Sequence, residues 1–125
     1  MTTDTLITGL HTVGIPVSDQ DKALAFYAGT LGLEVRLDVP MGEGNRWIEV
    51  APPGGGVSLA LERAHGERWT GVETGIRLTS ADVDATHAAL CAQGVDADDV
   101  LRWPGVPAMF ALRDQDDNGL EIVEA

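Results

Sequence analysis

Hydrophobic and polar positions in the first half of the chain predict a strand, a helix and three further short strands. Residues 13–17, VGIPV, are apolar and rich in β-branched side chains, which favours a strand. Ser18 and Asp19 follow as candidate N-caps of a helix, because their side chains can accept hydrogen bonds from the first helical N–H groups. Apolar residues then recur at helical spacing up to Gly32, a typical helix end. The strands that follow are expected near 34–40, 45–51 and 57–62.

The second half of the chain repeats this order of elements. Residues 75–80 predict a strand, Ser80 and Asp82 are the candidate helix caps, and the apolar positions of the next helix run to Gly94. Three more strands are expected near 96–102, 107–113 and 119–124. The sequence therefore predicts a βαβββ unit that occurs twice.

These units indicate a single α+β domain of two half-modules, at roughly 6–64 and 72–124, joined by RAHGERWTG at 63–71. A chain of 125 residues is long enough for one compact core but not for two independent ones. Neither half can bury its own sheet face alone, because a small sheet needs a second layer against it.

Charge and cysteine content narrow the expected partners and compartment. Eight basic against twenty acidic residues give a net charge of −12, which disfavours nucleic acid and anionic membranes and attracts cationic small molecules. No apolar run has the length of a membrane span, and the opening MTTDTLITG lacks the basic region and apolar stretch of a signal peptide. The single cysteine excludes an intrachain disulfide and suits a reducing compartment. We therefore expect a cytoplasmic protein that contacts neither membrane nor nucleic acid.

Two motifs resemble a known family. GIPVSDQDKALAFYAGTLGLEV at 14–35 is similar to the opening of the vicinal oxygen chelate superfamily, which includes glyoxalase I, extradiol dioxygenases and bleomycin-resistance proteins. MFALRDQDDNGLEIVE at 109–124 resembles that family's Asp-Pro-Asp-Gly-Asn turn and last strand, although Asp117 replaces the turn glycine. The resemblance implies paired modules that curl into a half-barrel around a cavity, usually completed in a homodimer. We expect the positive-φ position of the turn to have moved along the chain, because Gly119 now follows Asn118.

In metal-dependent members of that family, four side chains on four strands bind a divalent cation and leave positions open for substrate oxygens. The first of these positions falls on Thr12, the third on Gly75 and the fourth on Glu121. The second falls within 57–62, where the only candidate is Glu62, an exposed charge at the end of its predicted strand. One carboxylate does not make a transition-metal site. The resemblance therefore implies a lost metal centre with Glu121 as its remnant, and we expect neither metal nor cofactor.

His11 is expected not to replace the missing ligands. On an extended chain it shares a face with Val13 and Ile15, which should pack under the helix, whereas Thr12 shares the opposite face with Gly14.

Two further histidines and the cysteine could in principle bind a metal or act as a nucleophile, but we expect neither role for them. His65 lies in the link and His87 on the outer helix, so both are expected at the surface or half-buried. Cys91 falls beside Leu90 on the apolar side of the second helix and is expected to be buried rather than reactive.

The remaining candidates for a binding site are aromatic. Trp47 lies on a predicted strand and Trp103 in the loop before VPAMF, a region where bleomycin-resistance proteins also carry a tryptophan near their ligand groove. Indole rings stack on planar ligands and attract cations, although each tryptophan could equally fill the core or a dimer interface. Met109 and Phe110 point to opposite sides of one strand, so one of them should line the cavity, and we select Phe110. The predicted ligand-binding residues are Thr12, Trp47, Gly75, Trp103, Phe110 and Glu121, with no catalytic residue assigned.

Three hypotheses for function follow. The first is a metal-free homodimer that sequesters a small, cationic or aromatic molecule. The second is an enzyme of the same superfamily, of the lyase, isomerase or dioxygenase type, that keeps a metal in a rearranged site or uses Glu121 as a general base. The third is a non-catalytic regulatory partner, which no residue specifically favours.

Overall fold

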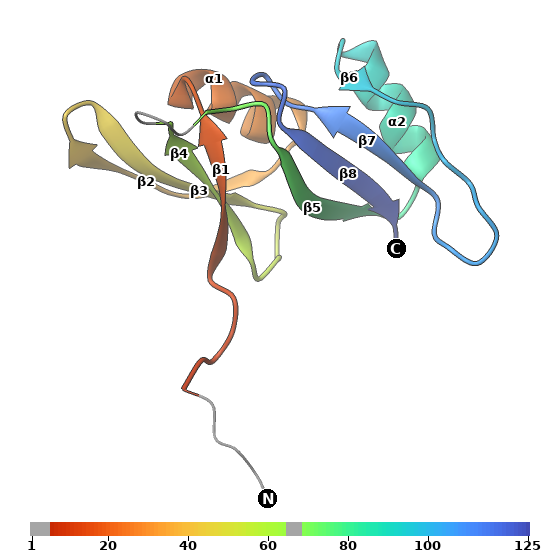
Figure 1. The fold of residues 1–125 in the computed structure, drawn as a ribbon, viewed down its shortest axis with the longest axis horizontal. Helices are drawn as coiled ribbons and strands as arrows, with labels where there is room; N and C mark the ends of the chain where they lie inside the picture. Colours follow the sequence, from red (N-terminus) through yellow and green to blue (C-terminus); the bar gives the residue numbers. More distant parts are fainter. Residues whose placement is uncertain (1–5, 65–68) are drawn as a thin grey trace, which may run out of the picture.

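Both halves of the chain fold into the predicted βαβββ order (Figure 1). The computed structural model describes residues 6–64 and 69–125. The first sheet has the strand order β1-β4-β3-β2, in which β1 and β4 are parallel and the other pairs antiparallel. Its elements are β1 (Thr12–Val17), α1 (Gln20–Leu24), the π-helical segment η1 (Ala25–Thr30), β2 (Glu34–Gly42), β3 (Asn45–Ala51) and β4 (Ser58–Arg63).

The second sheet repeats this topology with the order β5-β8-β7-β6. Its elements are β5 (Glu73–Ser80), α2 (Val83–Ala92), β6 (Asp96–Ala97), β7 (Met109–Arg113) and β8 (Gly119–Glu124). The strand expected over 96–102 is therefore much shorter. Beyond it the backbone bonds to β7 at Asp98, whose N–H donates to the Ala111 carbonyl, and at an isolated bridge between Leu101 and Met109. The predicted α+β class is confirmed, as two open four-stranded sheets.

Both helices begin and end where the sequence indicates. Asp19 caps α1 by accepting a hydrogen bond from the Lys22 N–H, and Asp82 caps α2 through the Ala85 N–H. Gly32 follows η1 with positive φ. In Figure 1 both helices lie on the same side of the two sheets, so each sheet keeps one face without a helix, which we call its open face. None of the described helices is long and apolar enough to cross a membrane.

Strand alternation decides which side chains enter the core. On the helix side, β1 and β4 place Ile15 against Leu61 in register, and both are buried. β8 places Leu120 and Ile122 on the corresponding side of the second sheet. These residues belong to one apolar core shared by the two halves. The intervening residues of each strand therefore occupy the open faces.

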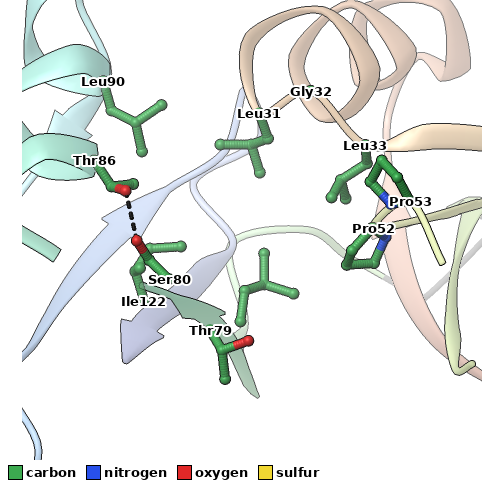
Figure 2. Close-up of a pocket in the computed structure, with 11 residues that line it drawn as sticks. Leu31, Gly32, Leu33, Pro52, Pro53, Thr79, Ser80, Thr86, Leu90 and Ile122 are labelled. Carbon is green, nitrogen blue, oxygen red and sulfur yellow. Dashed lines mark hydrogen bonds between the residues drawn. The ribbon is translucent and has the colours of Figure 1, made fainter. Parts of the chain in front are cut away.

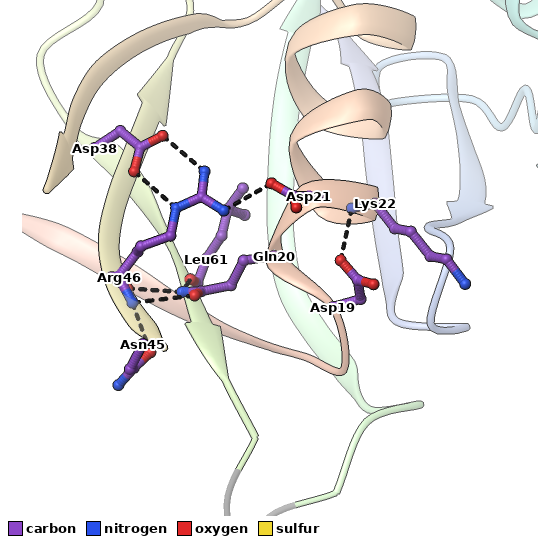
Figure 3. Close-up of polar contacts among 8 residues, drawn as sticks. All are labelled: Asp19, Gln20, Asp21, Lys22, Asp38, Asn45, Arg46 and Leu61. Atoms are coloured by element: carbon purple, nitrogen blue, oxygen red, sulfur yellow. Dashed lines mark hydrogen bonds and ion pairs between the residues drawn. The ribbon is translucent and has the colours of Figure 1, made fainter. Parts of the chain in front are cut away.

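Arg46 ties the β2–β3 hairpin to the start of α1 (Figure 3). Its guanidinium lies 2.7 Å from Asp21 at the helix start and 2.8 Å from Asp38 on β2. The Gln20 side chain is buried and donates to the backbone carbonyls of Arg46 and Leu61. The hairpin is thus fixed to the helix by polar contacts as well as by the core.

Asn118 joins the two halves of the molecule. Its side chain is fully buried, and Nδ2 donates to the Pro16 carbonyl at 2.8 Å and to Asp114 at 3.0 Å. Oδ1 accepts from the backbone N–H groups of Gly71 and Val72. One amide therefore links the end of β1, the segment before β5 and the β7–β8 turn.

The β7–β8 turn does not have its positive-φ residue at a shifted position, as the placement of Gly119 had suggested. Asp117 has φ 62°, whereas Gly119 begins β8 and is buried. The left-handed position therefore stays on Asp117, where a short polar side chain is tolerated better than most. Gly119 lies beside Glu73, and a Cβ there would require the end of the Glu73 side chain to shift.

Tyr27 adds a second buried contact between the halves. Its phenol is buried on η1 and donates a 2.6 Å hydrogen bond to the Asp114 carboxylate. Burial first, and then the hydrogen bond to Asp114 and the negative charges of Asp114 and Asp116, raise the pKa of Tyr27 far above its usual range. Each of these effects opposes formation of the phenolate.

We predict that Tyr27 couples stability to alkaline pH. Because its folded-state pKa is raised, the contribution is complete below the ordinary pKa of about 10 and is lost as the pH rises above that value. Tyr27 is the only tyrosine, so absorbance at the phenolate band reports this residue alone. Ionisation should occur only as the protein unfolds. Tyr27→Phe should lower the free energy of unfolding at pH 7 by about 1–3 kcal/mol and remove most of the loss above pH ~10. Ordinary titration near pH 10 in the folded protein would contradict this.

Candidate functional site

Glu121 lies on the open face of the second sheet, as predicted, and it is held there by an arginine. On β8 it stands between Leu120 and Ile122, whose side chains enter the core. Its Oε1 lies 2.9 Å from Nε of Arg77, its register partner on β5. The carboxylate that the sequence marks as the main polar group of a cavity is therefore one half of an ion pair.

Gly75 shapes the strand that carries Arg77. The pairing of β5 with β8 jumps from Glu73 to Arg77, so β5 bulges at this point. Gly75 has φ 73°, which side-chain-bearing residues rarely adopt. The Thr74 hydroxyl donates to the Gly119 carbonyl at 2.6 Å and accepts the Ile76 N–H, which replaces ladder bonds lost in the bulge. Gly75 thus serves to form the bulge that precedes Arg77.

A cavity of about 450 Å³ lies between the unpaired edges of β1 and β5. Its walls are mostly apolar, with Val13 and Leu59 from the first half and Ile76 and Leu78 from the second. The PPGGG loop between β3 and β4 covers one side. The cavity includes Gly75 and Arg77 but neither Thr12 nor Glu121 among its described lining residues.

A smaller cavity of about 260 Å³ lies between residues 31–33, α2 and β5 (Figure 2). The two cavities share Pro52, Leu78 and Thr79. Figure 2 shows the hydroxyl groups of Ser80 and Thr86 hydrogen-bonded to each other at 2.7 Å on one wall. With these hydroxyls paired, the smaller cavity is lined mainly by aliphatic groups.

Glu49 forms a second polar cluster, on the open face of the first sheet. It is only 7% exposed, and its carboxylate accepts 2.7 Å hydrogen bonds from Trp47 Nε1 and the Ser58 hydroxyl. His11 Nε2 lies 3.2 Å from the same carboxylate. The bonds from Trp47 and Ser58, followed by the contact with His11, lower the pKa of Glu49. Glu49 is therefore a buried, charged group at neutral pH.

The position of His11 corrects the expectation that it packs under the helix. Residue 11 precedes β1, so the strand alternation does not extend to it, and its side chain is 79% exposed beside Glu49. Thr12, the first residue of β1, donates its hydroxyl to the Ser58 carbonyl at 3.0 Å. Its polar group is thus used within the sheet.

Phe110 does not line an open cavity. It is 1% exposed on the helix side of β7, with its ring packed edge-on against His87 of α2 at a centroid distance of 4.9 Å. Met109 occupies the open face opposite Val123 and is half-buried. The choice of Phe110 was therefore wrong. Met109 occupies the open face instead, because the register of β7 directs the odd-numbered side chains away from the helices.

The two candidate tryptophans lie apart from the β1–β5 cavity. Trp47 is half-buried, pairs in register with the exposed Val39, and binds Glu49 through its indole N–H. Trp103 is 68% exposed and lines a hollow of about 480 Å³ with Arg102, Pro104, residues 106–108 and Glu124. Neither indole is among the residues that line the cavity beside Arg77.

The other reactive side chains remain outside these clusters. His87 is half-buried and its Nε2 lies 2.9 Å from the Asp98 carbonyl. Cys91 is exposed, contrary to expectation, because the buried side of α2 runs through Val83 and Leu90 and residue 91 falls beyond it. His65 lies outside the described residues.

Of the six predicted residues, Gly75 and Glu121 are linked through Arg77, and Thr12 and Trp47 are linked through Ser58 and Glu49. Arg77 and Glu49 were missed from the sequence. Glu49 could have been found by alternation, since it follows Trp47 by two residues on the same strand, whereas the bulge at Gly75 interrupts the alternation before Arg77.

Comparison with known proteins identifies relatives of this architecture. The family model described as Glyoxalase/Bleomycin resistance protein/Dioxygenase superfamily matches residues 9–122. TnmS3, an antibiotic binding protein from Streptomyces sp. CB03234, is 33% identical over 97% of this chain and 98% of its own, with a TM-score of 0.87. A member of the same superfamily from Sphaerobacter thermophilus DSM 20745 is also 33% identical, over 97% of this chain and 100% of its own, with a TM-score of 0.89.

A curated relative matches a shorter stretch. The uncharacterised protein YetH of Bacillus subtilis (strain 168) is 38% identical over 56 residues, which are 45% of this chain and 47% of YetH. The match thus spans about half the length of that relative.

The donor groups of this chain do not fit a transition-metal centre of the kind found in metal-dependent relatives. At three of the four expected positions, the hydroxyl of Thr12 is bonded within the sheet, Gly75 has no side chain, and Glu121 already contacts Arg77. Among residues 6–64 and 69–125, no three His, Cys, Asp or Glu side chains are grouped so that they could hold a metal ion. A guanidinium beside the one remaining carboxylate also opposes a cation there.

We predict that Glu49 stabilises the fold at neutral pH. Glu49→Gln should lower the free energy of unfolding at pH 7 by about 1–3 kcal/mol, because the amide cannot accept all three contacts. Since the folded-state pKa is lowered, the difference should be complete above the ordinary pKa of about 4.3 and should shrink as the pH falls below it. Urea unfolding across this range measures the effect, with the exposed Glu34→Gln as control. A difference that is independent of pH would contradict the assignment.

Proposed function

Because the chain belongs to the Glyoxalase/Bleomycin resistance protein/Dioxygenase superfamily, we propose that it is a metal-free protein that binds a small, largely apolar or aromatic molecule. The ligand site is the cavity between the edges of β1 and β5, extended by the smaller cavity along β5.

The β1–β5 cavity is the observation that carries this proposal. Its volume of about 450 Å³ and its mostly aliphatic walls are those of a site for a small organic ligand. Both bordering strands are sheet edges, so backbone N–H and C=O groups along them have no neighbouring strand to pair with on the cavity side. These groups can orient the polar atoms of a ligand.

The likeness to TnmS3 supports the same reading. That protein binds an antibiotic, and it resembles this chain over almost the full length of both. An antibiotic or another small organic metabolite is therefore the ligand class that we propose here. The metal-dependent alternative receives no support from the donor set, so we derive no metal-assisted reaction.

We also propose that the protein acts as a homodimer. β2 is the outer strand of its sheet, and Leu37, Val39 and Met41 are exposed on it. An exposed edge strand with apolar side chains favours association, and a second copy of the chain would cover it. Sedimentation at micromolar concentration should give twice the mass of the 13.2-kDa chain, and a single-chain mass would contradict the dimer.

A neutral fluorescent probe tests the ligand site. N-phenyl-1-naphthylamine has an apolar aromatic body without charge, and in the presence of EDTA it should bind at one saturable site per chain. Val57→Trp should weaken this binding by about 10-fold or more, because Val57 is exposed and the larger ring fills the cavity that it lines. Val35→Trp, at an exposed position outside the cavity, should leave the affinity unchanged.

Two results would contradict the proposal. One is the absence of saturable probe binding. The other is binding that requires an added divalent metal ion or that is unaffected by filling the cavity.

A further inference from the structure

The β1–β5 cavity carries a single charge. Among the described residues that line it, Arg77 is the only ionisable one, and the rest are aliphatic side chains, glycines, threonines and a proline. In a site of this kind the apolar wall binds the body of the ligand, and the few polar groups select its orientation and chemistry. The charge of Arg77 therefore bears directly on which ligand the cavity accepts.

The contact with Glu121 leaves most of the guanidinium available. It uses Nε of Arg77, so the two terminal nitrogens keep four N–H groups in the planar fork that matches a carboxylate or sulfonate. The Arg77 side chain is 61% exposed, so a ligand can reach it. Because Glu121 holds the side chain at Nε, less conformational entropy is lost when a ligand binds the fork.

The overall charge of the protein makes such a site selective. At a net charge of −12 the surface repels anions, so an anionic group needs a local positive partner to bind. The small neighbours of the pair leave room above it: Ala111 lies opposite Glu121 on β7, and an added Cβ at Gly75 would meet open space.

We propose that Arg77 binds an anionic or oxygen-rich group of the ligand, such as a carboxylate, phenolate or sulfonate, while the cavity holds its apolar body. Arg77 supplies a positive charge beside Glu121, the residue at the fourth ligand position of metal-dependent relatives, and Glu121 is its positioning residue. The inference rests on the proposed function, since it names the ligand class of the same cavity. It differs from the expectation of a cationic ligand, which was drawn from the net charge of the whole chain.

Two probes with the same aromatic body separate this inference from the proposed function. 8-Anilinonaphthalene-1-sulfonate carries a sulfonate on the anilinonaphthalene body, and N-phenyl-1-naphthylamine is that body without it. Fluorescence titration of both probes into the intact protein measures the contribution of the anionic group, and urea unfolding of each variant confirms that the fold is kept.

Arg77→Gln should weaken binding of the sulfonate by about 10-fold or more and change binding of the neutral probe by less than about threefold. Arg77→Lys should give an intermediate loss, because the charge remains and the fork is lost. Glu121→Gln should retain sulfonate binding within about threefold, since its amide oxygen still accepts from Nε and no negative charge remains beside the ligand. Arg102→Gln, at the hollow beside Trp103, removes the same charge elsewhere and should change neither probe.

Each contrary result has a defined meaning. Equal losses for both probes in Arg77→Gln, or the same loss in Glu121→Gln as in Arg77→Gln, would show that the ion pair is only structural and would overturn the inference. A sulfonate no better bound than the neutral probe, or one weakened by Arg102→Gln alone, would also overturn it while leaving the proposed function intact. Failure of both probes to bind would overturn the proposed function itself.

Discussion

The buried amide of Asn118 is the contact on which the arrangement of the two halves depends. It bonds the end of β1, the segment that leads into β5 and the β7–β8 turn, and because its side chain is fully buried an unmade hydrogen bond there would be costly. Because the halves are joined at this point and through a shared core, β1 and β5 remain sheet edges that do not pair with each other. The β1–β5 cavity is a consequence of that geometry.

The same geometry explains how a cavity with a single charged side chain among its described lining residues can still select its ligands. Alternation along β8 directs Glu121 away from the core, and the bulge at Gly75 precedes Arg77 on the neighbouring strand. A carboxylate with an arginine needs no metal ion to balance its charge, and the arginine keeps donors for a ligand. The acidic character of the chain then opposes anions everywhere except where such a local donor exists.

The fold was largely predictable because its local signals agree with one another. The positions of both helices follow from the N-caps Asp19 and Asp82. Those of most strands follow from the change between strand and helix spacing of hydrophobic residues, which occurs in both halves. Strand parity also predicted correctly that Glu121 faces away from the helix. The predicted length of β6 was wrong, because nothing in the sequence of 96–102 shows that strand pairing stops after Ala97.

The candidate site was less predictable, for physical reasons. The alternation of side chains fails where a strand begins or bulges. This explains why the predicted orientation of His11 was wrong, and why the link between Gly75 and Arg77 was missed. The choice between Met109 and Phe110 depended on the register of β7, which the sequence does not specify. Pairs such as Arg77 and Glu121 join residues distant in the chain, so their contact follows only from the sheet order.

A crystal structure of the protein with 8-anilinonaphthalene-1-sulfonate tests the role of Arg77 most directly. The sulfonate should lie within hydrogen-bond distance of the terminal nitrogens of Arg77, with the rings between β1 and β5 and Arg77 still in contact with Glu121. A probe bound only beside Trp103, or a metal ion bound by Glu121 with Arg77 displaced, would contradict it.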